Sequence, residues 1–190
     1  MASKSRDSKS SDAPRWLQDA RDHWTHRGAE RPAFAEEPGR GQESVWDYPR
    51  PPAVVPDSRR VVVEDGDGVI ADAAHSIRVL ETSHPPTFYV APEFVVAGRL
   101  APVSGSSHCE WKGIAEYVGV TGSEEPIGWR YPKPYAEFAD HAGWVAFYPG
   151  RVRCLVDGEV VRPQAGGFYG GWITDDVVGP FKGDPGTSGW

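Results

Sequence analysis

The residues with the clearest chemical potential lie in the segment Glu81-Thr82-Ser83-His84-Pro85-Pro86. In the strand expected before it, Ile77 and Val79 share a face with Glu81, so a carboxylate stands at the end of an apolar face. The two prolines fix the backbone beyond His84. Because burial and neighbouring charges can tune both side chains, Glu81 and His84 could act as general base and proton shuttle. A structural ion pair or a hydrogen-bonded turn would use the same residues.

A second chemical group is the segment Cys109-Glu110-Trp111-Lys112-Gly113, which we expect to open a strand over residues 110–120. Alternation then places Cys109 and Trp111 on a mostly apolar face. Glu110 and Lys112 point to the other face. Lys112 is the positive group positioned to hold a carboxylate or a phosphate. Alternatively, it belongs to a surface row of ion pairs, which contributes little to stability.

The chain has two cysteines, Cys109 and Cys154. Cys109 could be a nucleophile if a base activated it, but His108 beside it points to the opposite face of a strand. Cys154 alternates with Val152 and Val156 on an apolar face. We therefore favour buried structural roles for both cysteines. Without a CxxC motif they supply neither a disulfide scaffold nor a four-thiolate zinc site, so we expect no zinc and no other metal.

Aromatic residues near these groups could wall a ligand cleft, although packing in the core explains most of them equally well. The candidates are Tyr148, Phe168, Tyr169 and Trp172. The site hypothesis has Glu81 and His84 as catalytic candidates. Its ligand-binding candidates are Lys112, Tyr148, Trp111, Trp172, Cys109 and Glu110. Asp140-His141 is a second acid–imidazole pair, which a charged turn before a buried strand also explains.

Composition and charge exclude several classes of protein. The net charge is −7, and residues 1–40 hold 8 basic and 7 acidic side chains, which leaves 12 basic and 20 acidic ones in residues 41–190. An acidic domain repels phosphate backbones, so we expect no nucleic-acid partner. We also expect a cytoplasmic protein without a membrane partner, because no apolar run approaches the roughly 20 residues of a membrane span and no signal peptide is apparent. Walker, Rossmann, GxSxG and HExxH motifs are absent.

The elements that must position these residues fall into two parts. Residues 1–42 form an N-terminal extension and linker, of which residues 1–11 are too polar to repay the entropy of ordering and are expected to be disordered. A short helix follows, capped by Asp12 and ended by Gly28. Its apolar face holds Trp16, Leu17, Ala20 and Trp24. This face packs onto the domain or, alternatively, binds a partner protein.

Residues 43–190 predict a single, mainly β domain. Asp-Gly turns at residues 65–68 and 157–158 predict two β-hairpins, and turn chemistry explains these acidic residues better than a metal site. The connections between strands are too short for crossover helices, which favours antiparallel sheets. Residues 163–190 alternate glycine with aromatic residues and are expected to form an ordered wrap. The other expected strands are Ser76–Thr82, Thr87–Val90, Ile127–Arg130, Gly143–Tyr148, Arg151–Asp157 and Glu159–Arg162.

Several strings, taken in order from Glu43 to Trp190, resemble the domain of unknown function family 427, which is common in bacteria and fungi. The most specific strings are Glu81-Thr82-Ser83-His84-Pro85-Pro86, Cys109-Glu110-Trp111-Lys112-Gly113, Val145-Ala146-Phe147-Tyr148-Pro149, and the stretches Gly166–Trp172 and Gly179–Gly183. The resemblance implies a small β domain of the β-tent arrangement, shared with methionine sulfoxide reductase B and the cereblon ligand-binding domain. Those relatives carry zinc on cysteine pairs that this chain lacks, so zinc and reductase chemistry do not transfer.

Three functions are compatible with the sequence. The leading hypothesis is a small-molecule-binding domain, with or without enzymatic activity, whose ligand and oligomeric state the sequence does not identify. The second is a protein-interaction module that uses the N-terminal helix or the aromatic C-terminal segment. The third is a nucleotidyltransferase-like enzyme, a label sometimes given to the resembled family. The sequence does not support this label. It lacks the expected Gly-Ser followed by paired catalytic carboxylates, and Asp65-Gly66-Asp67 predicts a turn.

Overall fold

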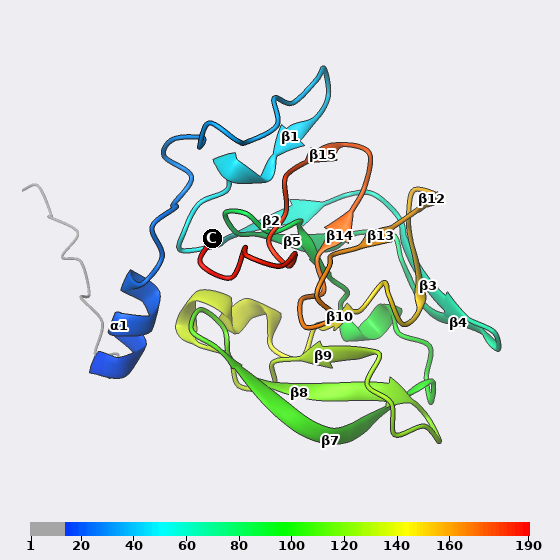
Figure 1. The fold of residues 1–190 in the computed structure, drawn as a ribbon. Coiled ribbons are helices and arrows are strands. Elements are labelled where there is room, and N and C mark those ends of the chain that lie inside the picture. Colours follow the sequence, from blue (N-terminus) through cyan, green and yellow to red (C-terminus); the bar gives the residue numbers. More distant parts are fainter. Residues whose placement is uncertain (1–13) are drawn as a thin grey trace, which may run out of the picture.

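The computed structural model describes residues 14–190 and confirms a mainly β fold built largely from antiparallel strands (Figure 1). The segment 1–11, which we expected to be disordered, lies outside the described residues. One α-helix, α1 (Arg15–Asp22), precedes the strands, and three short 3₁₀ helices cover Val45–Asp47, Pro92–Phe94 and Ala136–His141. The strands lie in two four-stranded sheets, one three-stranded sheet and two strand pairs among these residues.

The first four-stranded sheet contains both predicted Asp-Gly hairpins. Its strands, in spatial order, are β12 (Glu159–Val160), β11 (Arg153–Val156), β3 (Val61–Asp65) and β4 (Gly68–Ala73). Asp157 and Gly158 have φ angles of 47° and 85°. Two positive φ angles in succession are what a type I′ hairpin turn needs, so Asp-Gly sits where the sequence predicted the chain to reverse.

The second four-stranded sheet corrects one prediction. Its strands are β10 (Val145–Phe147), β9 (Gly128–Arg130), β8 (Gly113–Val120) and β7 (Leu100–Cys109). The expectation of a strand over residues 110–120 was wrong at its start, because Cys109 pairs with Gly113 and the three residues between them form the hairpin turn. Gly113 has a φ angle of 103°, which glycine adopts without the strain that a side chain would cause. Lys112 therefore projects from a turn and not from a row of strand residues.

The three-stranded sheet carries the segment with Glu81 and His84. Its strands are β2 (Ala53–Asp57), β5 (Ser76–Leu80) and β6 (Thr87–Tyr89), all antiparallel. Glu81 follows β5 directly, and the loop with His84 leads into β6. A bridge between Val90 and Val145 joins this sheet to β10. The chain therefore brings the end of β6 beside β10 of the second four-stranded sheet.

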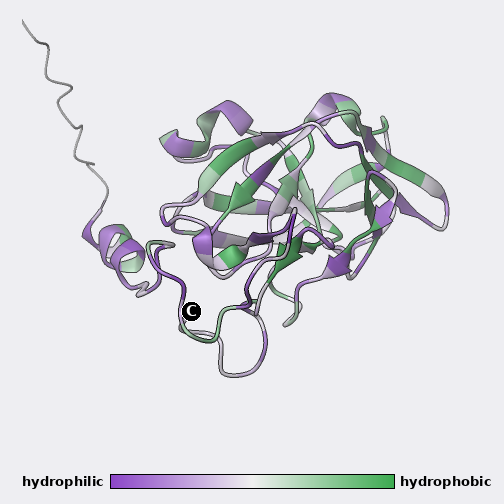
Figure 2. Cartoon of the chain, turned by 90° about the horizontal axis from the view of Figure 1, so that it is seen from above, coloured by the Kyte–Doolittle hydropathy of each residue, from purple (hydrophilic) through white to green (hydrophobic). Residues whose placement is uncertain are grey.

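Three buried clusters form the core of the described residues, and the smallest lies around Trp46 and Tyr48. One gathers aliphatic residues of β3, β4 and β11 around Phe88, Phe147 and Trp172. Another is mostly aromatic and includes Tyr89, Trp129, Tyr131, Phe138 and Tyr148. Figure 2 shows the apolar stretches on the strands at the centre, whereas α1 at the side is largely hydrophilic. The aromatic cluster lies on the side of the molecule where the candidate residues gather.

The two ends of the described chain come together beside the three-stranded sheet. Helix α1 ends at Asp22, earlier than the predicted stop at Gly28. Leu17 is buried, whereas 56% of Trp16 is exposed, so only part of the predicted apolar face packs on the domain. The C-terminal segment is ordered as expected and ends near the chain that follows α1 (Figure 1), where Phe34 stacks on Trp190.

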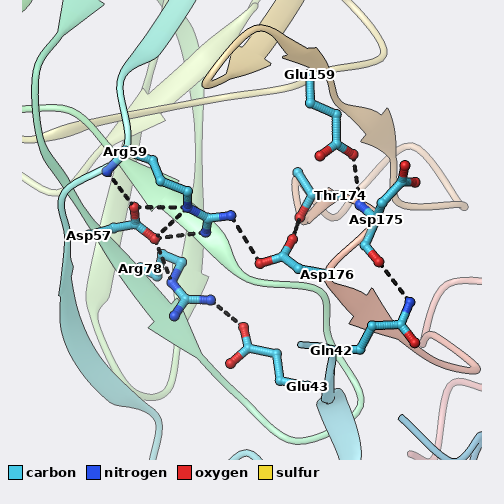
Figure 3. A network of polar contacts seen from close by, with 9 residues as sticks. All are labelled: Gln42, Glu43, Asp57, Arg59, Arg78, Glu159, Thr174, Asp175 and Asp176. Atoms are coloured by element: carbon cyan, nitrogen blue, oxygen red, sulfur yellow. Dashed lines mark hydrogen bonds and ion pairs between the residues drawn. The ribbon is translucent and has the colours of Figure 1, made fainter. Parts of the chain in front are cut away.

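A polar network fastens the strand pair β1 (Glu43–Ser44) and β15 (Val177–Val178) to the three-stranded sheet (Figure 3). Arg59 binds Asp57 with its Nη2 at 2.7 Å and Asp176 with its Nη1 at 2.9 Å. Arg78 pairs with Glu43 and, at 3.0 Å, with Asp57. The charged groups of this network are paired with one another, so its arrangement needs no ligand to compensate them. The remaining strand pair joins β13 (Arg162–Pro163) to β14 (Trp172–Ile173).

No helix among residues 14–190 has the length and the apolar character that crossing a membrane requires.

Candidate functional site

A cavity of about 200 Å³ lies between the end of β5, the β7–β8 turn and the C-terminal segment. The structure brings together six of the predicted site residues in its lining: Glu81, His84, Cys109, Glu110, Lys112 and Tyr148. These residues come from three separate parts of the sequence. The turn at residues 110–112 makes this possible, because it directs Lys112 back towards the side of the hairpin on which Cys109 lies.

Two predicted tryptophans lie elsewhere. Trp172 is fully buried in the aliphatic cluster, where it stacks on Phe88 and its indole N–H donates to the carbonyl oxygen of Phe147 at 3.0 Å. Trp111 lines a smaller cavity of about 70 Å³ that shares Val79 and Lys112 with the first. Trp111 and Trp172, both predicted to bind a ligand, therefore do not line the main cavity.

Glu81 is paired with Arg50, whose guanidinium is completely buried. The Arg50 Nε lies 3.0 Å from the Glu81 Oε1. Arg50 also donates through Nη2 to the carbonyl oxygens of Thr82 at 2.9 Å and Trp190 at 3.2 Å. Burial raises the pKa of Glu81, but the positive groups around it outweigh burial and hold the pKa below its ordinary value. Glu81 is therefore an ionised carboxylate whose charge is already neutralised.

The hydrogen bonds of Gln164 fix the tautomer of His84. The Gln164 side-chain oxygen accepts from the Gly171 amide at 3.0 Å, and its nitrogen donates to the Lys182 carbonyl oxygen at 2.7 Å. The same nitrogen lies 3.1 Å from His84 Nδ1, which must accept, so the ring hydrogen is on Nε2. Burial, reinforced by Lys182, Arg50 and Lys112, lowers the pKa of His84 to about 4. His84 thus offers the cavity a neutral N–H donor.

Among residues 14–190, Lys112 takes part in no ion pair. The other two unpaired charged groups of the cavity have hydrogen-bond partners, since Lys182 donates to the backbone oxygen of Trp190 and Glu110 accepts from Trp24. Its ammonium lies 5.8 Å from the centroid of the Tyr131 ring and interacts with the Cys109 sulfur and Tyr89. Burial lowers the pKa of Lys112, but the electronegative groups of Cys109, Tyr89 and Glu81 outweigh it and raise the pKa above its ordinary value. Lys112 is therefore a protonated, largely desolvated cation.

Aromatic rings form the floor of the cavity. The Trp129 indole donates to the Tyr89 hydroxyl at 3.2 Å, and its ring lies 4.5 Å from that of Tyr148. Burial raises the pKa of both Tyr89 and Tyr148 to about 12, so both hydroxyls stay protonated. Gly170 covers this floor so closely that a Cβ there would lie 2.2 Å from the Trp129 ring. Inclined aromatic rings with hydroxyl groups therefore line the same cavity as Lys112.

Sequence reasoning missed the aromatic residues Tyr89, Trp129 and Tyr131 of the cavity, and it missed four further residues in and around it. The Trp24 ring lies between two cations, 4.5 Å from the Arg50 guanidinium and 3.7 Å from the Lys182 ammonium, and its indole donates to Glu110 at 2.8 Å. Lys182 is almost fully buried, which lowers its pKa to about 8. Gln164 orients His84. The sequence placed Trp24 on the apolar face of the N-terminal helix. Lys182 lies in the Gly179–Gly183 stretch that resembles the family, and no local pattern distinguishes Arg50 or Gln164.

The other candidate residues have structural partners. Asp65 accepts from the Asp67 amide at 2.9 Å and pairs with Arg99 at 2.5 Å, which confirms the predicted turn. His141 packs against Phe138 and Trp144. Cys154 is buried as predicted. Within residues 14–190, no group of three or more His, Cys, Asp and Glu side chains is arranged to hold a metal ion.

A family profile described as "Domain of unknown function (DUF427)" matches residues 53–158, more than half of the chain. The matched range includes all six cavity residues that the sequence predicted. No curated protein matches the chain significantly.

Proposed function

The chain belongs to the family described as domain of unknown function 427, and we propose that its cavity binds a small anionic molecule whose charged group contacts Lys112. The observation that carries this proposal is a protonated lysine inside a cavity with no carboxylate paired to it. A desolvated ammonium is costly to keep unless an anion compensates it. A ligand carboxylate or phosphate supplies that compensation.

The charges around the cavity favour an anion although the whole chain carries a net charge of −7. Its lining includes two carboxylates, Glu81 and Glu110. Glu81 is neutralised by Arg50, and Glu110 accepts the indole hydrogen of Trp24. Lys112 and Lys182 remain as positive groups. Because the acids are engaged with protein partners, the field inside the cavity is positive against an acidic exterior.

The walls define the rest of the ligand. Trp129, Tyr148 and Tyr169 line the cavity with aromatic surface, which suits a planar or apolar body. At about 200 Å³ the cavity is below the roughly 300–1,000 Å³ of sites for drug-sized ligands, so a molecule of small-metabolite size fits best. The cavity thus combines an anion anchor with a small aromatic wall.

The same arrangement is suited to catalysis. The Lys112 ammonium and the His84 Nε2–H are preorganised donors in a water-poor site, the arrangement that stabilises an oxygen on which negative charge develops. In this proposal His84 acts as a neutral hydrogen-bond donor and not as a base. Glu81 accepts from Arg50 and holds it in place, and Arg50 in turn donates to the Thr82 carbonyl oxygen.

Native mass spectrometry of freshly purified protein tests the proposal, because a compound held in the cavity adds its mass to the chain. We expect a co-purifying small anion on the unmodified protein. The variant Lys112→Met should lose it, whereas Lys133→Met, which removes an exposed lysine, should keep it. If Lys112→Met keeps the compound as Lys133→Met does, the ligand does not bind at Lys112.

One observation favours a second function, protein interaction through the N-terminal helix. Trp16 is 56% exposed on α1 and contacts the exposed His108 with its ring. The exposed ring offers aromatic area of the kind that is enriched at protein interfaces. Sedimentation velocity of the unmodified chain and of Trp16→Ser tests this. If Trp16 lies in an interface, the two proteins should differ in their state of association.

A further inference from the structure

Cys109 packs against the aromatic cluster without being fully buried, so the buried position predicted for it was wrong. Cys109 is half-buried and lines the cavity, at the end of β7. The Lys112 ammonium and the Tyr131 hydroxyl both interact with the sulfur, and Tyr89 lies close to it. The sulfur therefore lies beside a lysine and two tyrosines at the cavity wall, a partly exposed and electropositive setting of the kind found around reactive cysteines.

Cys154 shows what a structural cysteine in this fold looks like. Only 1% of Cys154 is exposed, its thiol faces the Val152 carbonyl oxygen at 3.7 Å, and burial raises its pKa. No cation contacts it among the described residues. The contrast between the two cysteines assigns reactivity to Cys109 by position and surroundings.

We propose that Cys109 is a nucleophile of this cavity and adds reversibly to the carbonyl carbon of a small oxo acid whose carboxylate is held by Lys112. The proposal rests on the proposed anion-binding function and names its substrate class. Lys112 and Cys109 line the same 200 Å³ cavity, so a carboxylate at Lys112 places the carbon next to it within reach of the sulfur. An oxo acid carries its electrophilic carbon at that adjacent position.

The addition balances without a co-reactant. The sulfur electron pair forms a bond to the carbonyl carbon, and the π electron pair of the C=O bond passes to the oxygen. The oxygen ends with the hydrogen that the thiol gave up, relayed through the Lys112 ammonium, and the product is a thiohemiacetal or thiohemiketal. Nothing is oxidised or reduced. The His84 Nε2–H is available to hydrogen-bond the oxygen while it carries negative charge.

Carbon-13 NMR with [2-¹³C]glyoxylate as the probe tests the addition directly. In the unmodified protein we expect a new resonance at the position of a thiohemiacetal carbon. Cys109→Ser should abolish it, whereas Cys154→Ser should leave it unchanged. Absence of the resonance from unmodified protein at saturating glyoxylate overturns the proposal.

Alkylation rates provide a second test, whose first comparison uses the unmodified protein. Iodoacetate carries a carboxylate and iodoacetamide does not, and both form a carbon–sulfur bond with loss of iodide. Peptide mass spectrometry reports Cys109 and the buried Cys154 separately. For Cys109 we expect the ratio of the iodoacetate rate to the iodoacetamide rate to exceed that of glutathione by about tenfold, the effect of one pKa unit of charge interaction. Lys112→Met should remove this preference, and Lys133→Met should keep it.

The outcomes separate this proposal from the function on which it rests. If Cys109 reacts no faster than Cys154, the nucleophile is wrong, and anion binding at Lys112 is judged by the co-purification result alone. If Cys109 reacts quickly but without a preference for the anionic reagent, anion anchoring at Lys112 is wrong, and the assignment of an oxo acid falls with it.

Discussion

At the scale of residues, the protonation states of three side chains define the cavity. Glu81 is ionised because Arg50 is beside it, Lys112 is protonated because electronegative groups surround it, and His84 is neutral because it is buried among cations. Each state depends on the other two, since removing one charge changes the field on its neighbours. The fold therefore sets the charge states of Glu81, Lys112 and His84 in the absence of a ligand.

Acid should destabilise the fold through His84. Its pKa is about 4 in the folded chain against an ordinary value of 6.5, so the unfolded chain binds more protons between these values. Stability is full above pH 6.5 and falls as the pH is lowered towards 4, by up to about 3 kcal/mol from this residue. Glu81 acts in the same direction, because its lowered pKa makes its contribution disappear as it takes up a proton.

Urea unfolding at pH 7 and pH 4.5 measures this effect. His84→Asn keeps an acceptor for Gln164 and should flatten the loss of stability over that interval. His75→Asn, at an exposed histidine, serves as the matched control and should leave the loss unchanged. An equal pH dependence in all three proteins would show that His84 is not held neutral by the fold.

At the scale of elements, the sequence predicted those strands and hairpins that follow from alternating apolar residues and from turn-forming residues. The Asp-Gly hairpins and the strand that leads to Glu81 were predicted correctly, since each depends on local preferences. The β7–β8 turn was missed because Trp111 and Lys112 continue an alternating pattern, and only the pairing of Cys109 with Gly113 reveals the reversal. Long-range pairing carries no signature within a short window.

Gly170 is the backbone element that shapes the aromatic floor, and its substitution tests that role. A Cβ at Gly170 would lie 2.2 Å from the Trp129 ring, so Gly170→Ala should displace the ring or the loop and cost about 1–3 kcal/mol of stability. Gly66→Ala is the matched control, because nothing lies within 4 Å of its added methyl group. Urea unfolding compares the two, and equal losses would mean that the loop yields without disturbing the floor.

At the scale of the whole molecule, the cavity joins segments from both ends of the described chain. Trp24 comes from the N-terminal extension, and Gln164, Tyr169 and Lys182 come from the C-terminal segment. The sequence divided residues 1–42 from the domain at 43–190, a division that stays a prediction, and it gave no sign that Trp24 reaches the site. Contacts such as Trp24 with Lys182, 158 positions apart in the numbering, depend on the complete fold.

Trp24 should therefore matter more than its neighbour Trp16. Trp24→Ala removes a ring that contacts Arg50 and Lys182, and we expect a loss of about 1–2 kcal/mol in the free energy of unfolding. Trp16→Ala, at a residue 56% exposed, should change it by no more than about 0.5 kcal/mol. Denaturant titration of both variants measures the difference, and equal small effects would argue that the extension does not close the cavity.

The most direct test of anion binding at Lys112 is calorimetric titration with small carboxylates, each paired with its own primary amide, such as benzoate with benzamide. We predict that the carboxylate of the tightest-binding pair binds at least about tenfold more strongly than its amide, because a charge-assisted hydrogen bond to Lys112 is lost in the amide. This preference should disappear in Lys112→Met and persist in Lys133→Met. Amides that bind as tightly as their carboxylates, or a preference that survives without Lys112, would contradict the account.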